Sequence, residues 1–305
     1  MIRRPQIALL PDGRRLHLQD GPIDLIVEAT GEVSEIRTAY AAAAESLTGL
    51  LDRLCRELPR LRRNAAATDG ALRDPVARRM HAAVLPYAAE HFITPMAAVA
   101  GAVAEEVLGA MMRAAELERA YVNNGGDIAL HLSPRQQFTV GLVDRPDRPS
   151  LIGRTVIDAA SPVRGIATSG RGGRSFSLGI ADAVTVLAAT AARADAAATI
   201  IANAVDLPGH AGIKRCAASE LQPDSDLGER LVTREVPQLS QEEIAAALGG
   251  GIECAHGLLA RGLIEGASLH LQGATEVVAL SALSIDERIA GVPISTPQRE
   301  KPIHA

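Results

Sequence analysis

Apolar and polar residues alternate at the start of the chain and then change to helical spacing. Residues 6–29 contain three short alternating runs separated by two Asp-Gly pairs, which predicts paired β-strands joined by tight turns. From Ser34 the leucines recur at helical spacing, and this pattern predicts one long amphipathic helix that ends near Pro59. The chain therefore opens with sheet and continues with helix.

The same patterns assign the remaining segments in order. We predict a polar, alanine-rich linker over 64–74, a helix over 75–90 and a third helix from Thr94-Pro95 to Glu116. Later strands are expected over 121–124, 128–132, 138–143 and 231–236, with a surface turn at 146–149, a polar loop at 219–229 and two strands flanking Gly273. A capping-box sequence at Ser240 and Glu243 predicts the start of another helix.

The stretch from Val163 to Asp206 combines a glycine-rich loop with an unusually apolar helix. The helix is alanine, isoleucine and valine on almost every side, which is typical of a helix buried all round. Its polar exceptions Asp195, Thr199, Asn203 and Asp206 fall within an arc of about 80° at 100° per residue, with Arg193 roughly opposite. An uncompensated buried charge costs several kcal/mol, so this stripe predicts a cation, a polar ligand or a wet cavity beside the helix.

Composition excludes several classes of protein. The net charge is −5 and the chain has no Trp, three Tyr and three Phe, so a nucleic-acid partner is not expected. No uninterrupted apolar run is long enough for a membrane span, and the first apolar run is too short for a secretory signal. Three widely spaced cysteines without CxxC spacing fit a reduced cytoplasm and do not support a zinc site.

The alternation of strands and helices predicts an α+β fold, with mixed or antiparallel sheets covered by alanine-rich helices. The 305 residues are compatible with two domains, but we expect one domain over 1–290 followed by a loose C-terminal tail over 291–305. A homo-oligomer is compatible with this organisation.

About a third of the chain contains short motifs that follow one another in the same order as in a known protein family. They are Gly101 in the third helix, Asn123-Asn124-Gly125-Gly126-Asp127-Ile128, Thr168-Ser169-Gly170, Val184-Thr185-Val186 and Ala194-Asp195-Ala196-Ala197-Ala198-Thr199. Together they resemble the ApbE superfamily, the Mg-dependent FAD:protein FMN transferases, and in particular a divergent, cytosolic branch. The aromatic-rich N-terminal flavin-binding part of the family is not recognisable in this chain, which also departs from the family motifs in two places. Ala100 precedes Gly101 where the family has lysine, and no histidine lies between Gly170 and Thr185, where a His-Ile-Ile-Asp-Pro segment is expected.

The resemblance implies an ApbE-like, T-fold-like architecture and a Mg²⁺ site. It assigns Mg²⁺ ligands to Asp195 and Thr199, one helical turn apart, which suits a cation that prefers hard oxygen ligands. The alternative is that Asp195 pairs with an arginine and Thr199 bonds to its own helix. The family cofactor FAD, or another phosphate-bearing small molecule, is the expected ligand.

The remaining candidate ligand-binding residues lie in two loops and on the helix. Backbone N–H groups and arginines of the 170–174 loop suit a phosphate or carboxylate, although the loop matches neither standard phosphate motif and a flexible surface loop is the alternative. Gly125 and Gly126 would let a ligand lie on bare backbone, although a structural turn explains them equally well. The candidates are Gly125, Gly126, Asp127, Thr168, Ser169, Gly170, Arg171, Arg174 and Asn203.

No other nucleophile or metal motif emerges from the residues. The histidines show no ligand spacing, and only His210, just past the polar helix, is placed to reach the site. The sequence therefore favours a Mg²⁺-dependent, transferase-related enzyme whose catalytic residues remain unassigned. Two alternatives stay open: a catalytically inactive ligand-binding protein on the same fold, and an enzyme with an unrelated substrate.

Overall fold

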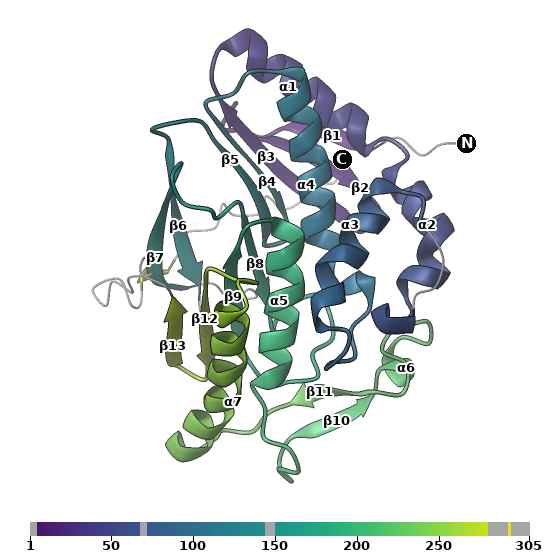
Figure 1. The fold of residues 1–305 in the computed structure, drawn as a ribbon, viewed down its shortest axis with the longest axis vertical. Coiled ribbons are helices and arrows are strands. Elements are labelled where there is room, and N and C mark those ends of the chain that lie inside the picture. The colour runs from purple at the N-terminus through teal and green to yellow at the C-terminus, as the bar shows by residue number, and fades with distance from the viewer. Residues whose placement is uncertain (1–4, 68–71, 144–149, 280–291, 294–305) are drawn as a thin grey trace, which may run out of the picture.

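A large antiparallel sheet with helices on one face organises the molecule (Figure 1). The computed structural model describes residues 5–67, 72–143, 150–279 and 292–293. Within these residues the sheet has nine strands in the order β1-β2-β3-β4-β5-β8-β9-β12-β13, and every neighbouring pair is antiparallel. Its strands are β1 (Gln6–Leu9), β2 (Leu16–Asp20), β3 (Ile23–Thr30), β4 (Arg119–Asn124), β5 (Asp127–Leu132), β8 (Gly165–Ser169), β9 (Ala183–Ala188), β12 (Gly266–Leu271) and β13 (Ala274–Ala279).

The helices cover one face of this sheet in a row. Neighbouring helices α1, α4, α5 and α7 contact one another in that order, and α3 packs on α4 and α5 (Figure 1). Helix α4 lies against β4 and β5, α5 against β8 and β9, and α7 against β12 and β13. The helices are α1 (Val33–Leu47), α2 (Leu50–Leu61), α3 (Pro75–Val84), α4 (Val99–Ala114), α5 (Ala191–Ala204), α6 (Ala218–Leu221) and α7 (Gln241–Ala260), with short 3₁₀ turns η1 (Ala65–Ala67), η2 (Leu85–Tyr87) and η3 (Pro95–Ala98).

Residue alternation in the strands determines which side chains meet the helices. In β2 and β3 every second side chain is buried, as the alternating apolar pattern predicts. In β4, Val122 belongs to the core beneath the helices, whereas its neighbour Tyr121 faces the other side. Helix α5 is buried along most of its length, since small alanines let it lie close to the sheet and to the flanking helices.

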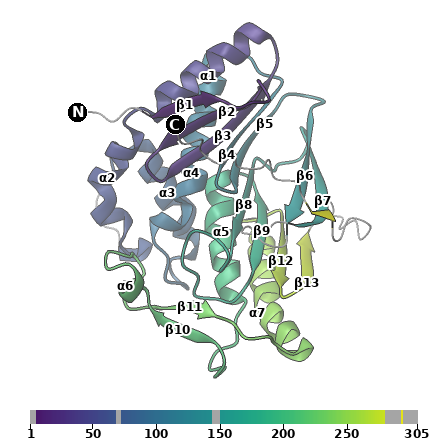
Figure 2. The ribbon, with the colours of Figure 1, turned by 180° about the vertical axis from the view of Figure 1, so that it is seen from behind.

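A smaller sheet covers part of the opposite face. Strands β6 (Gln137–Val143), β7 (Ser150–Asp158) and β14 (Val292–Pro293) pair in the order β14-β7-β6. A second apolar cluster joins Ile157 of β7 to Leu130, Ile166 and Leu187 of the large sheet. Figure 2 shows this side of the molecule, where β1 to β4 lie in front of the helices. A third, two-stranded sheet joins β10 (Lys214–Ala217) to β11 (Leu231–Glu235).

The α+β expectation, with an antiparallel sheet covered by helices, is confirmed in this general form. The predicted hairpins at the N-terminus and around Gly273 are confirmed, and the capping box at Ser240 and Glu243 is present at the start of α7. The expectation of one continuous helix from Ser34 is wrong. Gly49 adopts a left-handed φ of 71° and separates α1 from α2, while the leucine spacing continues across the break.

Two further boundaries differ from the sequence prediction. The helix expected over 75–90 ends at Val84 and continues only as a 3₁₀ turn, and the polar loop over 219–229 overlaps α6. Strands β7 and β10 were not predicted. The turn at 146–149 lies outside the described residues, as does the tail over 291–305 except for Val292–Pro293, which pair with β7.

One described segment, Pro95–Ala114, is long and apolar enough to cross a membrane by length and hydropathy alone. Half of it is buried inside the fold, and α4 contacts α1, α3, α5 and two strands. Its apolar residues therefore already have partners within the protein, as expected for a core helix.

Candidate functional site

The most unusual electrostatic feature of the molecule lies where the first turns of α4 and α5 meet. Asp195 Oδ2 accepts a hydrogen bond of 3.0 Å from the backbone N–H of Gly101. The helices approach so closely that a Cβ on Gly101 would lie 2.3 Å from the carbonyl oxygen of Ala191. The lack of a side chain at Gly101 thus brings a carboxylate of one helix onto the free N–H groups at the start of another.

A second carboxylate, Asp127, approaches from the sheet. It is the first residue of β5, and its Oδ1 accepts a hydrogen bond of 3.3 Å from the backbone N–H of Thr168 in β8. Desolvation by the surrounding protein raises the pKa of Asp127 to about 7. Arg174 and the Thr168 N–H act in the opposite direction, favouring the charged form.

Asp127 and Asp195 perturb each other. Desolvation raises the pKa of Asp195 well above its usual value, and the neighbouring Asp127 charge raises it further. Backbone N–H groups of Gly101 and Ala100 only partly offset these effects. Two carboxyl groups in one desolvated site cannot both ionise without a cation, so the pair is a candidate functional site. Both residues keep some exposed surface, so the site is not sealed from solvent.

Asn124 stands beside this acid pair. It is the last residue of β4 and 4% exposed, and it is the register partner of Asp127 across the turn. Its Nδ2 donates to the carbonyl oxygen of Ala100 at 3.1 Å, in the same turn of α4 that contacts Asp195. Its Oδ1 is buried and has no hydrogen-bond partner in the part of the chain that the structure describes. Such a buried orphan oxygen is uncommon and requires a reason.

The turn between Asn124 and Asp127 requires its two glycines. Gly125 and Gly126 have φ values of +67° and +115°, which residues with a side chain rarely adopt. The guanidinium of Arg174 lies directly over Gly125, where an added Cβ would be 2.1 Å from Nη2. The turn thus leaves room for Arg174, which is near enough to Asp127 to favour the charged form of that carboxyl group. The ligand role of these residues stays a prediction.

The polar stripe of α5 divides into two parts. Thr199 lies one turn after Asp195 and is partly exposed, and its hydroxyl makes no hydrogen bond within the described residues. Asn203 Oδ1 instead accepts a hydrogen bond of 3.0 Å from the backbone N–H of Leu178. Asp206 lies beyond the helix and forms an ion pair with Arg215. Asn203 and Asp206, at the C-terminal end of the stripe, thus hold neighbouring segments in place. The ligand role of Asn203 stays a prediction.

Arg171 and Arg174, which the sequence grouped together, have different surroundings. Arg171 Nη2 bonds Asp182 Oδ1 at 2.5 Å, and the other oxygen of Asp182 accepts the backbone N–H of Gln272. Arg171 therefore links the loop to the β9 and β12 ends of the sheet. Ser169 ends β8, and Gly170, with a φ of +148°, lies where a Cβ would be 2.5 Å from the carbonyl oxygen of Asp182.

His210 does not join the acid pair. Its Nε2 lies 3.0 Å from Glu243 Oε1 at the start of α7, and its Nδ1 accepts the N–H of Gly212. The expectation that this histidine reaches the site is therefore wrong, since the chain after α5 turns toward α7 and away from β5. Sequence reasoning does not find Asn124, because it lies within the Asn123–Ile128 motif and no local pattern gives it a role. Its only signal was its position directly before the Gly-Gly turn.

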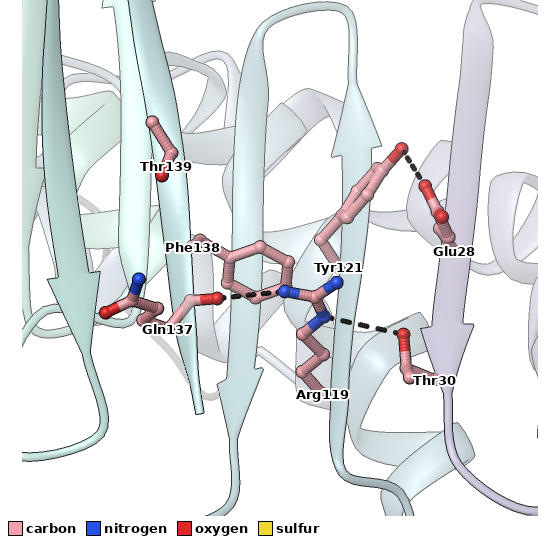
Figure 3. A pocket seen from close by; sticks show the side chains of 7 residues that line it. All are labelled: Glu28, Thr30, Arg119, Tyr121, Gln137, Phe138 and Thr139. Atoms are coloured by element: carbon pink, nitrogen blue, oxygen red, sulfur yellow. Dashed lines mark hydrogen bonds between the residues drawn. The ribbon is translucent and has the colours of Figure 1, made fainter. Parts of the chain in front are cut away.

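A separate surface hollow of about 340 Å³ lies on the opposite face of the sheet (Figure 3). It is lined by side chains of β3, β4 and β6: Glu28, Thr30, Arg119, Tyr121, Gln137, Phe138 and Thr139. Tyr121 donates to Glu28 at 3.1 Å and Arg119 to the carbonyl oxygen of Gln137 at 3.0 Å, so these polar groups are engaged with one another. The acid pair, with its orphan oxygen and shifted pKa values, is the stronger candidate.

Comparison with known proteins agrees with the motif order. The family model described as AbpE bacteria matches residues 7–277, which is most of the chain. The chain belongs to this ApbE-like family. The resemblance inferred from the motifs is therefore confirmed at the level of the family, and the matched segment includes Asn124, Asp127 and Asp195.

Curated relatives of this ApbE-like protein come from archaea. It is similar to the UPF0280 protein of Methanopyrus kandleri, with 46% identity over 123 residues, which cover 40% of this chain and 48% of the relative. The UPF0280 protein of Methanothrix thermoacetophila is 33% identical over 192 residues, or 56% of this chain and 70% of the relative. That of Methanococcoides burtonii is 39% identical over 123 residues, or 40% of this chain and 50% of the relative. The chain thus spans about half the length of two of these relatives.

Proposed function

We propose that this protein is a Mg²⁺-dependent enzyme of the ApbE-like, T-fold-like type that binds a flavin nucleotide, such as FAD, or another phosphate-bearing small molecule. The observation that carries the proposal is the desolvated acid pair of Asp127 and Asp195, whose pKa values are both raised. Desolvation raises both pKa values, and the charge of Asp127 adds to the rise at Asp195. A divalent cation between the two carboxyl groups would stabilise their charged forms and so offset both effects. Family membership supports the same conclusion.

The oxygen chemistry of the site suits Mg²⁺. In the described residues no group of three or more His, Cys, Asp or Glu side chains could hold a metal, so a site closed by protein ligands alone is not supported. Mg²⁺ commonly uses one or two carboxylates and completes its shell with waters and substrate phosphates. Asp195, Asp127 and the hydroxyl of Thr199 would hold it. When bound, the cation would supply charge neutralisation for phosphate oxygens.

The protein's own residues would bind and orient the ligand. Arg174 would meet its anionic group, because this arginine lies over the Gly125-Gly126 turn and is near enough to lower the pKa of Asp127. The backbone of Gly125, Gly126 and the 168–170 segment would line the ligand. The first-turn N–H groups of α4 orient Asp195, which fixes the carboxylate before any ligand arrives.

A catalytically inactive ligand-binding protein is the second candidate. Contacts of Asp127 and Asp195 within the described residues come from backbone N–H groups and Arg174, and none comes from a histidine. A transfer reaction needs a group that accepts a proton from the attacking hydroxyl, and among the described residues the two carboxyl groups themselves are the candidates for this role. The three cysteines are free, which supports a reducing, cytoplasmic location for either candidate.

Thermal melting with FAD, with Mg²⁺, and with both together tests the proposed function. We expect the melting temperature to rise most when both are present, because cation and phosphate complete each other's binding. Asp195→Ala should abolish the Mg²⁺-dependent part of the rise, and isothermal titration should show the same loss. Glu242→Ala, an exposed residue in the first turn of α7, is the matched control and should behave like wild type. Unchanged FAD and Mg²⁺ affinity in a folded Asp195→Ala protein would overturn the metal assignment.

A further inference from the structure

In the part of the chain that the structure describes, Asn124 is a buried side chain next to the acid pair with one of its two polar atoms left without a hydrogen bond. Its Nδ2 is occupied by the Ala100 carbonyl, whereas its Oδ1 has no partner among the described residues. Burying an amide oxygen without a partner is unfavourable, because the oxygen loses its hydrogen bonds to water and gains none in the protein. A leucine, which has the same number of side-chain heavy atoms, would avoid this penalty, so the oxygen requires a partner that the described residues do not provide.

Three relationships place the Asn124 amide beside the carboxylates. Asn124 and Asp127 are register partners across a two-residue turn, so their side chains leave the sheet on the same face and side by side. The Nδ2 bond holds the Asn124 amide against Ala100, while the next residue, Gly101, donates to Asp195. One turn of α4 is thus held by Asn124 on one side and by Asp195 on the other.

We propose that Asn124 Oδ1 is a neutral oxygen ligand of the divalent cation held by Asp127 and Asp195. This inference rests on the proposed function and adds to it a residue from the sheet. Amide oxygens are hard ligands of the kind that Mg²⁺ and its substitute Mn²⁺ accept. The neutral ligand matters because it adds coordination without a third negative charge in a site where two carboxyl groups already repel each other.

The side-chain amide of Asn124 also has a structural role, which can be tested separately from the proposed metal binding. Its Nδ2 ties the start of α4 to the end of β4 and so orients the Gly101 N–H that holds Asp195. A purely structural Asn124 would act only through Nδ2, whereas a ligand acts through Oδ1. Substitutions that keep one atom and remove the other therefore distinguish the two roles.

The experiment measures Mn²⁺ binding by electron paramagnetic resonance, and Mg²⁺ by its competition, on wild type, Asn124→Asp and Asn124→Leu. The aspartate keeps an oxygen at the Oδ1 position and loses the amide donor, and the leucine loses both. We expect Asn124→Leu to bind Mn²⁺ at least tenfold more weakly and Asn124→Asp to bind it as tightly as wild type or more tightly. Asn123→Ala is the matched control, since Asn123 belongs to the same turn but serves the Gly126 N–H on the opposite face.

The outcomes separate the inference from the proposed function. If wild type binds no Mn²⁺, the proposed function and the inference fail together. If wild type binds Mn²⁺ and Asn124→Leu binds it equally well, only the inference fails. Equal weakening in the aspartate and leucine variants, with equally lowered melting temperatures, would assign Asn124 a structural role alone.

A measurement on the wild-type protein keeps the inference testable if the variants do not fold. With asparagine labelled selectively with ¹⁵N, the side-chain amide resonance of Asn124 should shift when Mg²⁺ is added. The side-chain amide of Asn64, whose Oδ1 accepts the N–H of Ala66 in an exposed turn, should not move. An unmoved Asn124 resonance under conditions in which Mg²⁺ binds would overturn the proposal.

Discussion

Asp195 on α5 and Gly101 on α4 are joined by a hydrogen bond of 3.0 Å between a carboxylate oxygen and a backbone N–H. The bond exists only because Gly101 has no side chain and the two helices can touch. The same contact that packs the core therefore orients the carboxylate of the candidate site. The packing of the two helices and the geometry of the candidate site depend here on one small residue.

Gly101→Ala should destabilise the fold, because its Cβ would lie 2.3 Å from the Ala191 carbonyl oxygen and the backbone must shift. We expect a loss of about 1–3 kcal/mol, as for other overpacked cores, measured by urea unfolding. Gly257→Ala in the exposed part of α7 is the control, since nothing lies within 4 Å of its added Cβ. It should stabilise the protein by up to about 1 kcal/mol through helix propensity. Equal effects in both variants would contradict the close contact of α4 and α5.

The metal-free protein should lose stability as the pH rises from about 4 to about 7. The pKa of Asp127 is about 7 in the folded protein against 3.8 for the free residue, so in this interval the folded state holds more protons than the unfolded chain. The stabilisation that protonated Asp127 gives the folded protein is fully present below pH 3.8. It is lost as the pH rises through about 7, the pKa of Asp127 in the folded state. Chemical unfolding of wild type and Asp127→Asn at several pH values measures it.

Asp127→Asn should flatten this dependence and be the more stable protein at pH 7.5, by on the order of 2 kcal/mol. Added Mg²⁺ should reverse the trend, since the cation binds the deprotonated carboxylates and its affinity rises with pH. A wild-type stability curve that rises between pH 4 and pH 7, parallel to that of the variant, would contradict the raised pKa of Asp127.

The two arginines of the glycine-rich loop should separate into a structural and a ligand-binding residue. Arg171→Ala leaves the buried carboxylate of Asp182 without its ion pair and should lower the melting temperature by several degrees. Arg174→Ala should leave the melting temperature of the ligand-free protein nearly unchanged and weaken FAD binding at least tenfold. Scanning calorimetry and titration on both single variants test this division, and a reversed pattern would exclude it.

The protein should not attach FMN to a threonine or serine of an acceptor domain. The histidine-containing segment of the related transferases is absent between Gly170 and Thr185, and the family lysine is replaced by Ala100. Incubation with FAD, Mg²⁺ and an acceptor domain, followed by in-gel fluorescence, is the measurement. A family transferase that retains both motifs serves as the positive control. A strong fluorescent band on the acceptor would refute the expectation.

Local patterns were sufficient for most elements and for the polar positions of α5. Alternation predicts the first strands and helical spacing predicts α4 and α5, because both depend on the periodicity of the backbone itself. The Asp195-Thr199 spacing likewise places both side chains on one face of the helix. The sequence does not predict the break at Gly49 because leucines continue on both sides of it, and it does not predict β7 because apolar and polar residues do not alternate regularly along that strand.

Tertiary structure alone determines which polar residues lie close together. Asp127 and Asp195 lie 68 residues apart, as the difference between their numbers shows, and only the stacking of α5 against the sheet brings them together. Desolvation, which shifts their pKa values, depends on all the surrounding chain and has no local signature. Arg171 and Arg174 are three residues apart in one loop, yet one pairs with Asp182 and the other covers Gly125, because side-chain direction within an irregular loop follows from what packs against it.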